Sequence, residues 1–501
     1  MKTPRRFAGL FACSLFLAVG CDGSDQDSGI PARFQPFAQA VEQERIALGA
    51  PGMAVAVVER GEVTFAHGFG RKDASRPDPV KPTTLFRIGS CTKMLTAMAL
   101  LQTVQEGQVS LDESITTHVP AFHLNKTPDA VAAIKLRDLL THTGGLSDYG
   151  ETNAPANEQT DGALEGFLTG RFADIGYVAS PPGAVWAYAN PDYMLAGLVV
   201  EKVRAIPYRT VMHDQVFAPL GMNRTFFLAS EVLADGDYAV GANCTTAGDP
   251  RCFEPGIGPV VQPDTYENPW GRPAGFAWSS VLDLAKVARF LVHGQDNLLR
   301  QDLWAAMTSA QVSTREAGDV ESYGFGVFVT EGFGGGMIFP YRALKLVHHG
   351  GDIAGFAADI ACVPDLDFCV VSLANSNAAH LSSSMVVALQ TLTSLPAPSP
   401  TPDVAPKADR YPLYVGSYND AFEVGQVDIT TDGGKLFIQL PTLDASNTPY
   451  TKELQPFAID NFVLTVDGTQ MPLTFIADAD GVYTYIRSRP YLAVRTSTQP
   501  K

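Results

Sequence analysis

The pattern of apolar positions is most distinctive between residues 94 and 104, where almost every side chain is apolar. An unbroken apolar run of this length predicts a helix that is buried on all sides. Glu106 and Gly107 follow the run and are typical of a helix end. Two further helical patterns cover residues 191–204 and 283–291. These helices are predicted to form the middle of a domain.

Strand patterns lie on both sides of the predicted helices. The runs 53–58 and 62–68 flank Glu59-Arg60-Gly61, which predicts a hairpin. Four later runs and a final helix are predicted over 323–330, 344–348, 356–362, 368–373 and 381–394. Strands at both ends with helices between them predict an α+β fold. One antiparallel sheet would be built from both ends of this domain and flanked by helices, beside an all-helical region.

The composition changes after residue 394. Five prolines between 395 and 410 predict a stiff, extended linker and a domain boundary. Within 411–501, three Asp-Gly pairs separate short runs of alternating polarity, which is typical of β-hairpins. The tail is therefore predicted to be a small all-β barrel or sandwich of about six to eight strands.

The N-terminus has the pattern of an export signal. Basic residues precede an apolar stretch over 7–20, which is too short to remain as a membrane span. Cys21 follows in a context that resembles a bacterial lipoprotein processing site, while ordinary signal cleavage stays open. Residues 1–21 are therefore predicted to be a lipoprotein-type signal peptide and 22–33 a tether. The mature chain would be exported to the bacterial cell envelope or periplasm and anchored to a membrane by a lipid on Cys21.

Charge and cysteine content narrow the possible partners. The 501-residue chain has a net charge of −17, which argues against nucleic acid as a partner. Export permits disulfides, and two local pairs are predicted, Cys244–Cys252 and Cys362–Cys369, which leave Cys91 unpaired. No C-x-x-C pair is present, so no metal site is predicted.

Candidate chemistry begins at Ser90, which lies three residues before Lys93 at the start of the apolar helix. Side chains at this spacing share one face of a helix. A neutral amine can take the proton of a neighbouring hydroxyl and make it nucleophilic. The motif alone is also compatible with an N-cap serine followed by a solvated lysine.

Two further motifs follow in the sequence. Tyr188-Ala189-Asn190 offers a phenol that could transfer protons and an amide that could orient the lysine. Tyr266-Glu267-Asn268 has the same spacing, but it lies in a Pro-rich loop. His349-Gly350-Gly351 lies at or within the end of a predicted strand, where glycines permit close approach of a substrate. His142-Thr143-Gly144 is the competing match to this third motif.

The three motifs in this order resemble the penicillin-recognising serine hydrolases. This family includes class C β-lactamases, D-alanyl-D-alanine carboxypeptidases and related esterases. Four flanking segments strengthen the resemblance: 86–89, 139–146, 193–198 and 273–275. The second of these resembles a mid-domain segment of the family and contains His142, which removes His142 from the third motif. The resemblance covers about residues 34–394, and 411–501 resembles the lipocalin-like domain appended to such hydrolases.

The resemblance implies a role for each motif residue. Ser90 would be the acylated nucleophile, and Lys93 and Tyr188 would share proton transfer. Asn190 would hold the lysine and a substrate carbonyl. The backbone N–H groups of Ser90 and Asp352 would form the oxyanion hole, next to His349 and Gly351 of the third motif. No metal or organic cofactor is implied, and the oligomeric state stays open.

One departure from the family pattern bears on the substrate. The typical β-lactamase has Lys-Thr-Gly at His349-Gly350-Gly351, and histidine is mostly neutral at pH 7. Asp352 also adds a negative charge near the expected position of a substrate carboxylate. We therefore expect a serine hydrolase that acts through an acyl-enzyme on small esters or D-amino-acid amides and peptides. The alternatives are a β-lactamase or D-alanyl-D-alanine carboxypeptidase, and a non-catalytic envelope binding protein that retains the fold.

Overall fold

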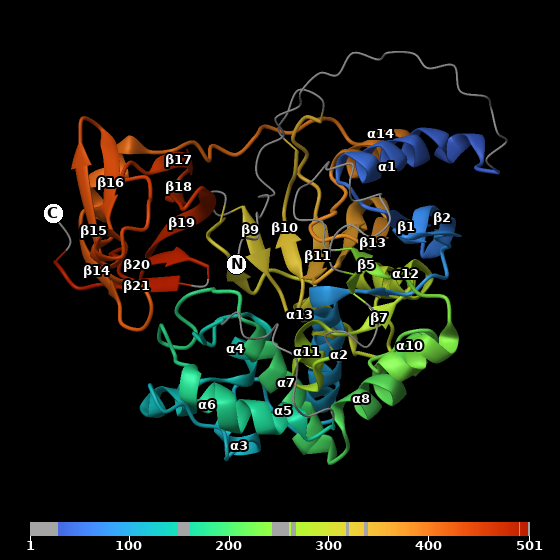
Figure 1. The fold of residues 1–501 in the computed structure, drawn as a ribbon, viewed down its shortest axis with the longest axis horizontal. Coiled ribbons are helices and arrows are strands. Elements are labelled where there is room, and N and C mark those ends of the chain that lie inside the picture. Colours follow the sequence, from blue (N-terminus) through green and yellow to red (C-terminus); the bar gives the residue numbers. More distant parts are fainter. Residues whose placement is uncertain are drawn as a thin grey trace.

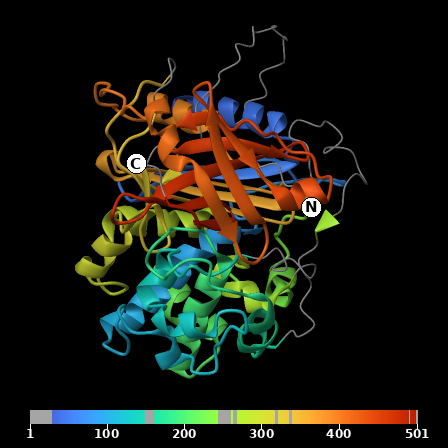
Figure 2. The same cartoon turned by 90° about the vertical axis from the view of Figure 1, so that its left-hand side faces the viewer.

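The computed structural model describes residues 29–148, 160–242, 260–261, 267–316, 320–334, 339–489 and 491–498. A mixed α/β domain occupies the centre and right of Figure 1, and an all-β unit lies at its left. Figure 2 views this all-β unit face-on, in front of the mixed domain. The expected α+β architecture with a C-terminal barrel-like domain is confirmed.

The mixed domain is built on an antiparallel sheet with nine strands among the described residues. Its order is β3 (Arg76–Pro79), β2 (Glu62–Asp73), β1 (Gly52–Glu59), β13 (Phe368–Ala374), β12 (Phe356–Val363), β11 (Leu346–Ile353), β10 (Phe328–Thr330), β9 (Glu321–Tyr323) and β8 (Val312–Ser313). Strand β1 pairs with β13, with Met53 opposite Ala374. The first and last parts of the domain therefore meet in the middle of the sheet, as predicted.

The alternation of side chains along β1 separates two cores. Ala54, Ala56 and Val58 are buried on the side of α2 (Thr92–Gln105) and α12 (Val281–His293). The residues between them pack on the opposite face against α1 (Gln35–Ala47) and α14 (Ser383–Leu392), which lie together above the sheet in Figure 1. Both faces of the sheet are thus covered, and the predicted central helix occupies the larger core.

The remaining helices form the region below the sheet in Figure 1. They are α3 (Ile115–His118), α4 (Leu136–Leu140), α5 (Ala163–Gly166), α6 (Phe172–Ile175), α7 (Asn190–Arg204), α8 (Tyr208–Val211), α9 (Ala218–Leu220), α10 (Ala229–Asp235), α11 (Arg272–Gly275) and α13 (Gln301–Met307). The predicted helices at 191–204 and 283–291 correspond to α7 and α12. None of the helices in the described ranges is long and apolar enough to cross a membrane.

Two strand predictions near the third motif were wrong in detail. The run 323–330 is divided into β9 and β10, because Gly326 adopts a φ of 82° in the turn between them. A Cβ on Gly326 would lie 3.0 Å from the Lys93 carbonyl oxygen, so the turn approaches α2 too closely for a side chain. The run 344–348 is longer than predicted, since β11 continues through His349-Gly350-Gly351 to Ile353.

The cysteine predictions have different outcomes. The Cys362–Cys369 disulfide is present and joins residues directly opposite each other in β12 and β13. Cys91 is a buried free thiol, as predicted. The Cys244–Cys252 pair and the lipidation site Cys21 lie outside the described residues.

The C-terminal unit is a nearly closed barrel-like sheet with eight strands in its described part. Its order is β16 (Lys435–Gln439), β15 (Gly425–Asp432), β14 (Gly416–Asp420), β21 (Tyr491–Arg495), β20 (Tyr483–Ser488), β19 (Thr469–Ala477), β18 (Asn461–Val466) and β17 (Gln455–Ala458), with short helices α15 (Tyr411–Tyr414) and α16 (Pro441–Ala445). Each predicted Asp-Gly pair lies at a turn between two of these strands.

The barrel is docked on the mixed domain through one buried arginine and an apolar cluster. Arg487 of β20 donates hydrogen bonds to the carbonyl oxygens of Trp186 (2.6 Å) and Thr314 (2.8 Å). Beside it, Val185 packs against Leu492 and other buried side chains of the barrel. The two units are therefore held together next to the motif that contains Tyr188.

We predict that Arg487→Met lowers the free energy of unfolding by about 3 kcal/mol, because two buried carbonyl groups lose a charged donor. Denaturant titration of the full chain measures this loss. Arg300→Met serves as the control, because Arg300 is exposed and pairs with exposed Asp302, and it should change stability by less than about 0.5 kcal/mol. Equal stability of the two variants would contradict this account of docking.

Candidate active site

Ser90 lies in a tight turn that leads directly into α2. The turn Gly89–Cys91 follows the short strand β4 (Phe86–Arg87), and Gly89 has a φ of 50°. Ser90 is partly exposed, whereas Lys93, one helical turn later, is completely buried. The apolar run that predicted the helix therefore also removes the lysine from solvent.

The Lys93 amine contacts three oxygen atoms. Its Nζ lies 2.8 Å from Asn190 Oδ1, 2.6 Å from the Ala274 carbonyl oxygen and 3.2 Å from Ser90 Oγ. The amide and carbonyl oxygens can only accept, so they take both hydrogens of a neutral amine. The lone pair of the amine then faces the Ser90 hydroxyl, which can donate to it.

Asn190 is itself fixed in one orientation by Asp148. Asp148 Oδ1 accepts hydrogen bonds of 3.0 Å from both the backbone N–H and the side-chain Nδ2 of Asn190. Because a carboxylate accepts only, the amide nitrogen must face Asp148 and the amide oxygen must face Lys93. The sequence predicted Asn190 as the partner of the lysine but did not identify Asp148.

Burial is the main cause of an unusual pKa at Lys93. Removal of the ammonium from water lowers the pKa of Lys93 to about 7, and Asp148 opposes this shift while Arg489 adds to it. A large fraction of Lys93 is therefore uncharged at neutral pH. This gives the amine the proton affinity that a base for Ser90 needs.

The ring of Tyr188 lies beside the Lys93 amine. Lys93 Nζ is 4.8 Å from the centre of the Tyr188 ring, and the Arg489 guanidinium is 4.2 Å from it. The ring of His142 packs 4.2 Å from that of Tyr188. His142 thus packs against Tyr188 from the protein interior. This position agrees with the assignment of the third motif to His349 rather than to His142.

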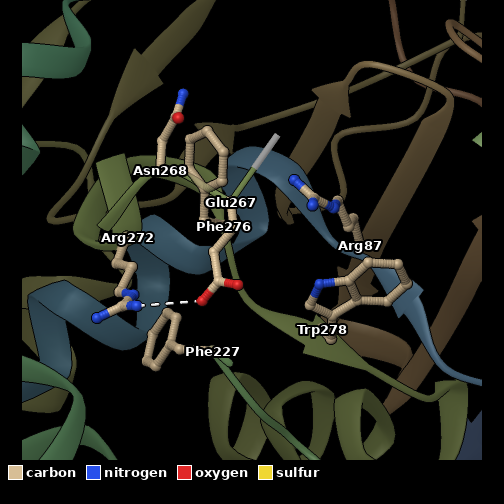
Figure 3. Close-up of a pocket in the computed structure, with 7 residues that line it drawn as sticks. All are labelled: Arg87, Phe227, Glu267, Asn268, Arg272, Phe276 and Trp278. Carbon is tan, nitrogen blue, oxygen red and sulfur yellow. Dashed lines mark hydrogen bonds and ion pairs between the residues drawn. The ribbon is translucent and has the colours of Figure 1, made fainter. Parts of the chain in front are cut away.

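Glu267 and Asn268 of the competing tripeptide line a different crevice. Figure 3 shows a separate crevice in which Arg272 binds Glu267 at 3.3 Å. Its lining residues are Arg87, Phe227, Glu267, Asn268, Arg272, Phe276 and Trp278. Neither Ser90 nor Lys93 belongs to this lining, and Tyr266 lies outside the described residues. The asparagine that contacts the lysine is Asn190 of the Tyr188 motif.

His349 is a buried, neutral imidazole on β11. Its Nε2 lies 3.0 Å from the Tyr323 hydroxyl and its Nδ1 lies 2.6 Å from the Gly350 carbonyl oxygen. The imidazole therefore donates from Nδ1 and accepts at Nε2. Burial, together with the charge of Lys93, lowers the pKa of His349 to about 3. The position that holds lysine in typical β-lactamases thus carries no positive charge.

The glycines around Ser90 permit a close backbone contact. A Cβ on Gly351 would lie 2.1 Å from the Ile88 carbonyl oxygen and 3.0 Å from the Ser90 nitrogen. A Cβ on Gly89 would lie 2.8 Å from the Asp352 nitrogen. The backbone segments that carry the Ser90 and Asp352 N–H groups are therefore packed directly against each other, as an oxyanion hole requires.

The Asp352 carboxylate, in contrast, does not lie where the sequence suggested. Alternation along β11 puts Asp352 on the face of Leu346, which packs with α1 and α14, opposite the face of Val347 and α2. Asp352 binds His380 Nε2 at 3.0 Å, and His380 Nδ1 binds Asp359 at 2.9 Å. The expected negative charge beside the substrate is thus held by His380 behind the sheet.

Cys91, next to the nucleophile, has a packing role. Its thiol donates a hydrogen bond of 3.2 Å to the His349 carbonyl oxygen, and burial raises the pKa of the Cys91 thiol well above its usual value. In the described part of the chain, no cluster of three or more His, Cys, Asp or Glu residues could hold a metal ion.

Two residues of the site were not found from the sequence, Asp148 and Arg489. Arg489 lies in the turn between β20 and β21 of the barrel, and its Nη2 binds Asp148 Oδ2 at 2.7 Å. Asp148 had a weak signal, because it follows the predicted family segment at 139–146. Arg489 had none, since only the docked barrel brings it next to Asp148 and Tyr188.

This fold and the position of Ser-x-x-Lys at the start of a buried helix define the class of the penicillin-recognising proteins. A family model described as Beta-lactamase matches residues 37–387, and the chain belongs to this family. Its serine β-lactamase and penicillin-binding-protein-like members are hydrolases.

Similar proteins extend the comparison. Protein flp of Staphylococcus aureus (strain MW2) is 26% identical over 332 residues, which are 66% of this chain and 61% of the relative. The chain thus matches about three fifths of the length of such relatives. A penicillin-binding protein homologue from Pyrococcus abyssi has a TM-score of 0.60 and 23% identity, with 92% of this chain and 99% of that chain covered. A D-stereospecific amidohydrolase from Streptomyces sp. has a TM-score of 0.54 and 24% identity, with coverage of 71% and 97%.

The two neighbouring glycines of the third motif provide a matched pair of variants. Gly351→Ala places a methyl group against the backbone of Ile88 and Ser90, so we predict that labelling of Ser90 by a fluorophosphonate probe slows by about 10²–10³-fold. A Cβ on Gly350 would come no closer than 3.3 Å to any atom beyond its chain neighbours, and that atom is the Asp359 side-chain oxygen, so Gly350→Ala should retain most of the rate. Similar rates for the two variants would contradict the proposed backbone contact.

Proposed function

We propose that the protein is a serine hydrolase that acts through an acyl-enzyme at Ser90 on small esters or D-amino-acid amides and peptides. The observation that carries this proposal is the orientation of the Lys93 amine. Two fixed acceptors occupy its hydrogens, and the third contact is the Ser90 hydroxyl at 3.2 Å. Lys93 can therefore accept the Ser90 proton as Oγ attacks the substrate carbonyl.

The remaining groups match the later parts of acyl transfer. Negative charge that develops on the carbonyl oxygen would be stabilised by the N–H groups of Ser90 and Asp352. The proton taken by Lys93 would pass to the leaving group, with the Tyr188 phenol as the second proton carrier. Water would then attack the acyl-enzyme, with the same groups acting in reverse order.

The charge distribution favours substrates without a carboxylate at the third motif. Neutral His349 replaces the lysine of typical β-lactamases, and this supports esters and amides over β-lactams. The Asp352 charge no longer contributes to this argument, because His380 binds it behind the sheet. The structural similarity to a D-stereospecific amidohydrolase supports D-amino-acid amides as one substrate class.

We also propose that the chain is exported and anchored to a membrane of the bacterial cell envelope through Cys21. The support is the sequence pattern of residues 1–21. A lipid-anchored hydrolase at this location would meet small esters and peptides outside the cytoplasm.

The nucleophile, base and phenol can be tested by single substitutions. We predict that Ser90→Ala abolishes fluorophosphonate labelling and hydrolysis of p-nitrophenyl butyrate. Lys93→Ala and Tyr188→Phe should lower the hydrolysis rate by about 10²–10⁴-fold, the usual contribution of a general acid or base. Cys91→Ala should keep the labelling, because the proposed reaction does not use the buried thiol of Cys91.

Two results would lead to a different conclusion. Undiminished hydrolysis by Ser90→Ala would contradict the proposed nucleophile. Absence of labelling in the unmodified protein would favour a binding protein that retains the fold, and faster turnover of nitrocefin than of any ester or D-amino-acid amide would favour a β-lactamase.

A further inference from the structure

The hairpin β20–β21 of the barrel carries two arginines that point into the mixed domain. Arg487 is buried and binds the carbonyl oxygen of Trp186 at 2.6 Å, two residues before Tyr188. Arg489 follows two positions later and lies 4.2 Å from the centre of the Tyr188 ring. Arg487 lies two residues before Arg489, so its contacts with the mixed domain hold this end of the hairpin beside Asp148 and Tyr188.

Arg489 joins a continuous series of polar contacts that ends at the nucleophile. Its Nη2 and Nε lie 2.7 and 3.3 Å from Asp148 Oδ2. The other carboxylate oxygen, Oδ1, holds Asn190 through two hydrogen bonds of 3.0 Å. Asn190 Oδ1 in turn accepts from Lys93, which contacts Ser90. The two oxygens of Asp148 thus bind different partners: Oδ1 binds Asn190, and Oδ2 binds Arg489 of the barrel.

In the described ranges, few charged groups face Lys93. Burial raises the pKa of Cys91, Asp192 and Tyr193 well above their usual values. Burial also lowers the pKa of His142 and His349. Burial thus favours the neutral form of all five groups. The Tyr188 ring also lies beside the amine. Among the described residues, the remaining ionic partners of Lys93 are the Asp148 carboxylate and the Arg489 guanidinium, which bind each other.

We infer that Arg489 is a positioning residue of the active site, supplied by the C-terminal barrel, which fixes Asp148 and through it the Asn190 amide and the Lys93 amine. This inference rests on the proposed function, because it assigns Arg489 to the base of that reaction. The alternative is that Arg489 only helps to dock the barrel. The two roles differ in their effect on the Lys93 amine, since docking alone leaves its proton affinity unchanged.

The sign of the effect follows from the charges. A guanidinium near Lys93 disfavours the ammonium, and a carboxylate favours it. Loss of Arg489 removes the guanidinium that disfavours the ammonium. It also leaves the Asp148 carboxylate without its cationic partner, so that its charge favours the ammonium more strongly. Each of these changes raises the pKa of Lys93. Loss of the Asp148 charge lowers it. Because the neutral amine is the active base, a higher pKa moves the rise of the rate toward higher pH.

The experiment measures the rate of fluorophosphonate labelling of the full chain between pH 5 and pH 10. This range covers the expected midpoint of the rise in rate, at about pH 7. Arg489→Gln should move the midpoint upward by about one pH unit, which is about a tenfold loss of rate at pH 6. Asp148→Asn should move it downward, and the charge-neutral double variant should return it toward that of the unmodified protein. Arg489→Lys keeps the charge without the two-nitrogen contact, so its midpoint should stay near 7 while the plateau rate falls.

Leu492→Ala provides the control for docking. Leu492 lies on the same hairpin and packs against Val185 without a charge, so this variant should lose stability and keep the midpoint. An unchanged midpoint in Arg489→Gln, or an equal shift in Leu492→Ala, would overturn the inference while the proposed function stands. Absence of Ser90 labelling in the unmodified protein would instead contradict the proposed function itself.

Discussion

The structure depends on one energetically demanding interaction, the burial of the Lys93 amine inside the helical core. An ammonium group in such a position is strongly disfavoured, and the protein responds by a lowered pKa rather than by a directly bonded carboxylate. The acceptors that surround the amine come from α7 and α11, and Ser90 lies one turn before it on the same structural unit. The packing of α2 against α7 and α11 therefore determines both the stability of this region and the reactivity of the serine.

This constraint explains why much of the site could be predicted from the sequence. Ser90, Lys93 and Asn190 lie at the starts of long helices with strong apolar patterns, so their positions follow from local signals. The motif at His349 directly follows an apolar run that predicts a strand. The sheet built from both ends of the domain follows from the order of strand runs around the helices, as the pairing of β1 with β13 confirms.

The features that could not be predicted depend on register or on distant contacts. The face of β11 that carries Asp352 is fixed by pairing with the neighbouring strands β10 and β12, and His380 follows β13 in the sequence. The division between β9 and β10 arises from the close approach of Gly326 to α2. Arg489 belongs to another structural unit, and no local pattern connects a hairpin turn at 489 with a loop at 148.

The C-terminal barrel acquires a clearer role from these contacts. Its interior is filled by aliphatic and aromatic side chains, and the aromatic ones that pack on one another include Tyr414, Tyr418, Phe462 and Phe475. Its influence on the rest of the molecule is therefore exerted at its surface, where the β20–β21 hairpin contacts Trp186, Asp148 and Tyr188. An appended domain can in this way contribute a charge to a site whose other groups all lie in the larger domain.

The central claim is that Lys93 titrates near neutrality, and the most direct test is NMR of the protein with isotope-labelled lysine side chains. We predict one lysine that titrates with a pKa of about 7, far below the usual value of about 10.4, and whose signal is lost in Lys93→Arg. A Lys93 signal that stays in the charged form up to pH 9 would contradict the account.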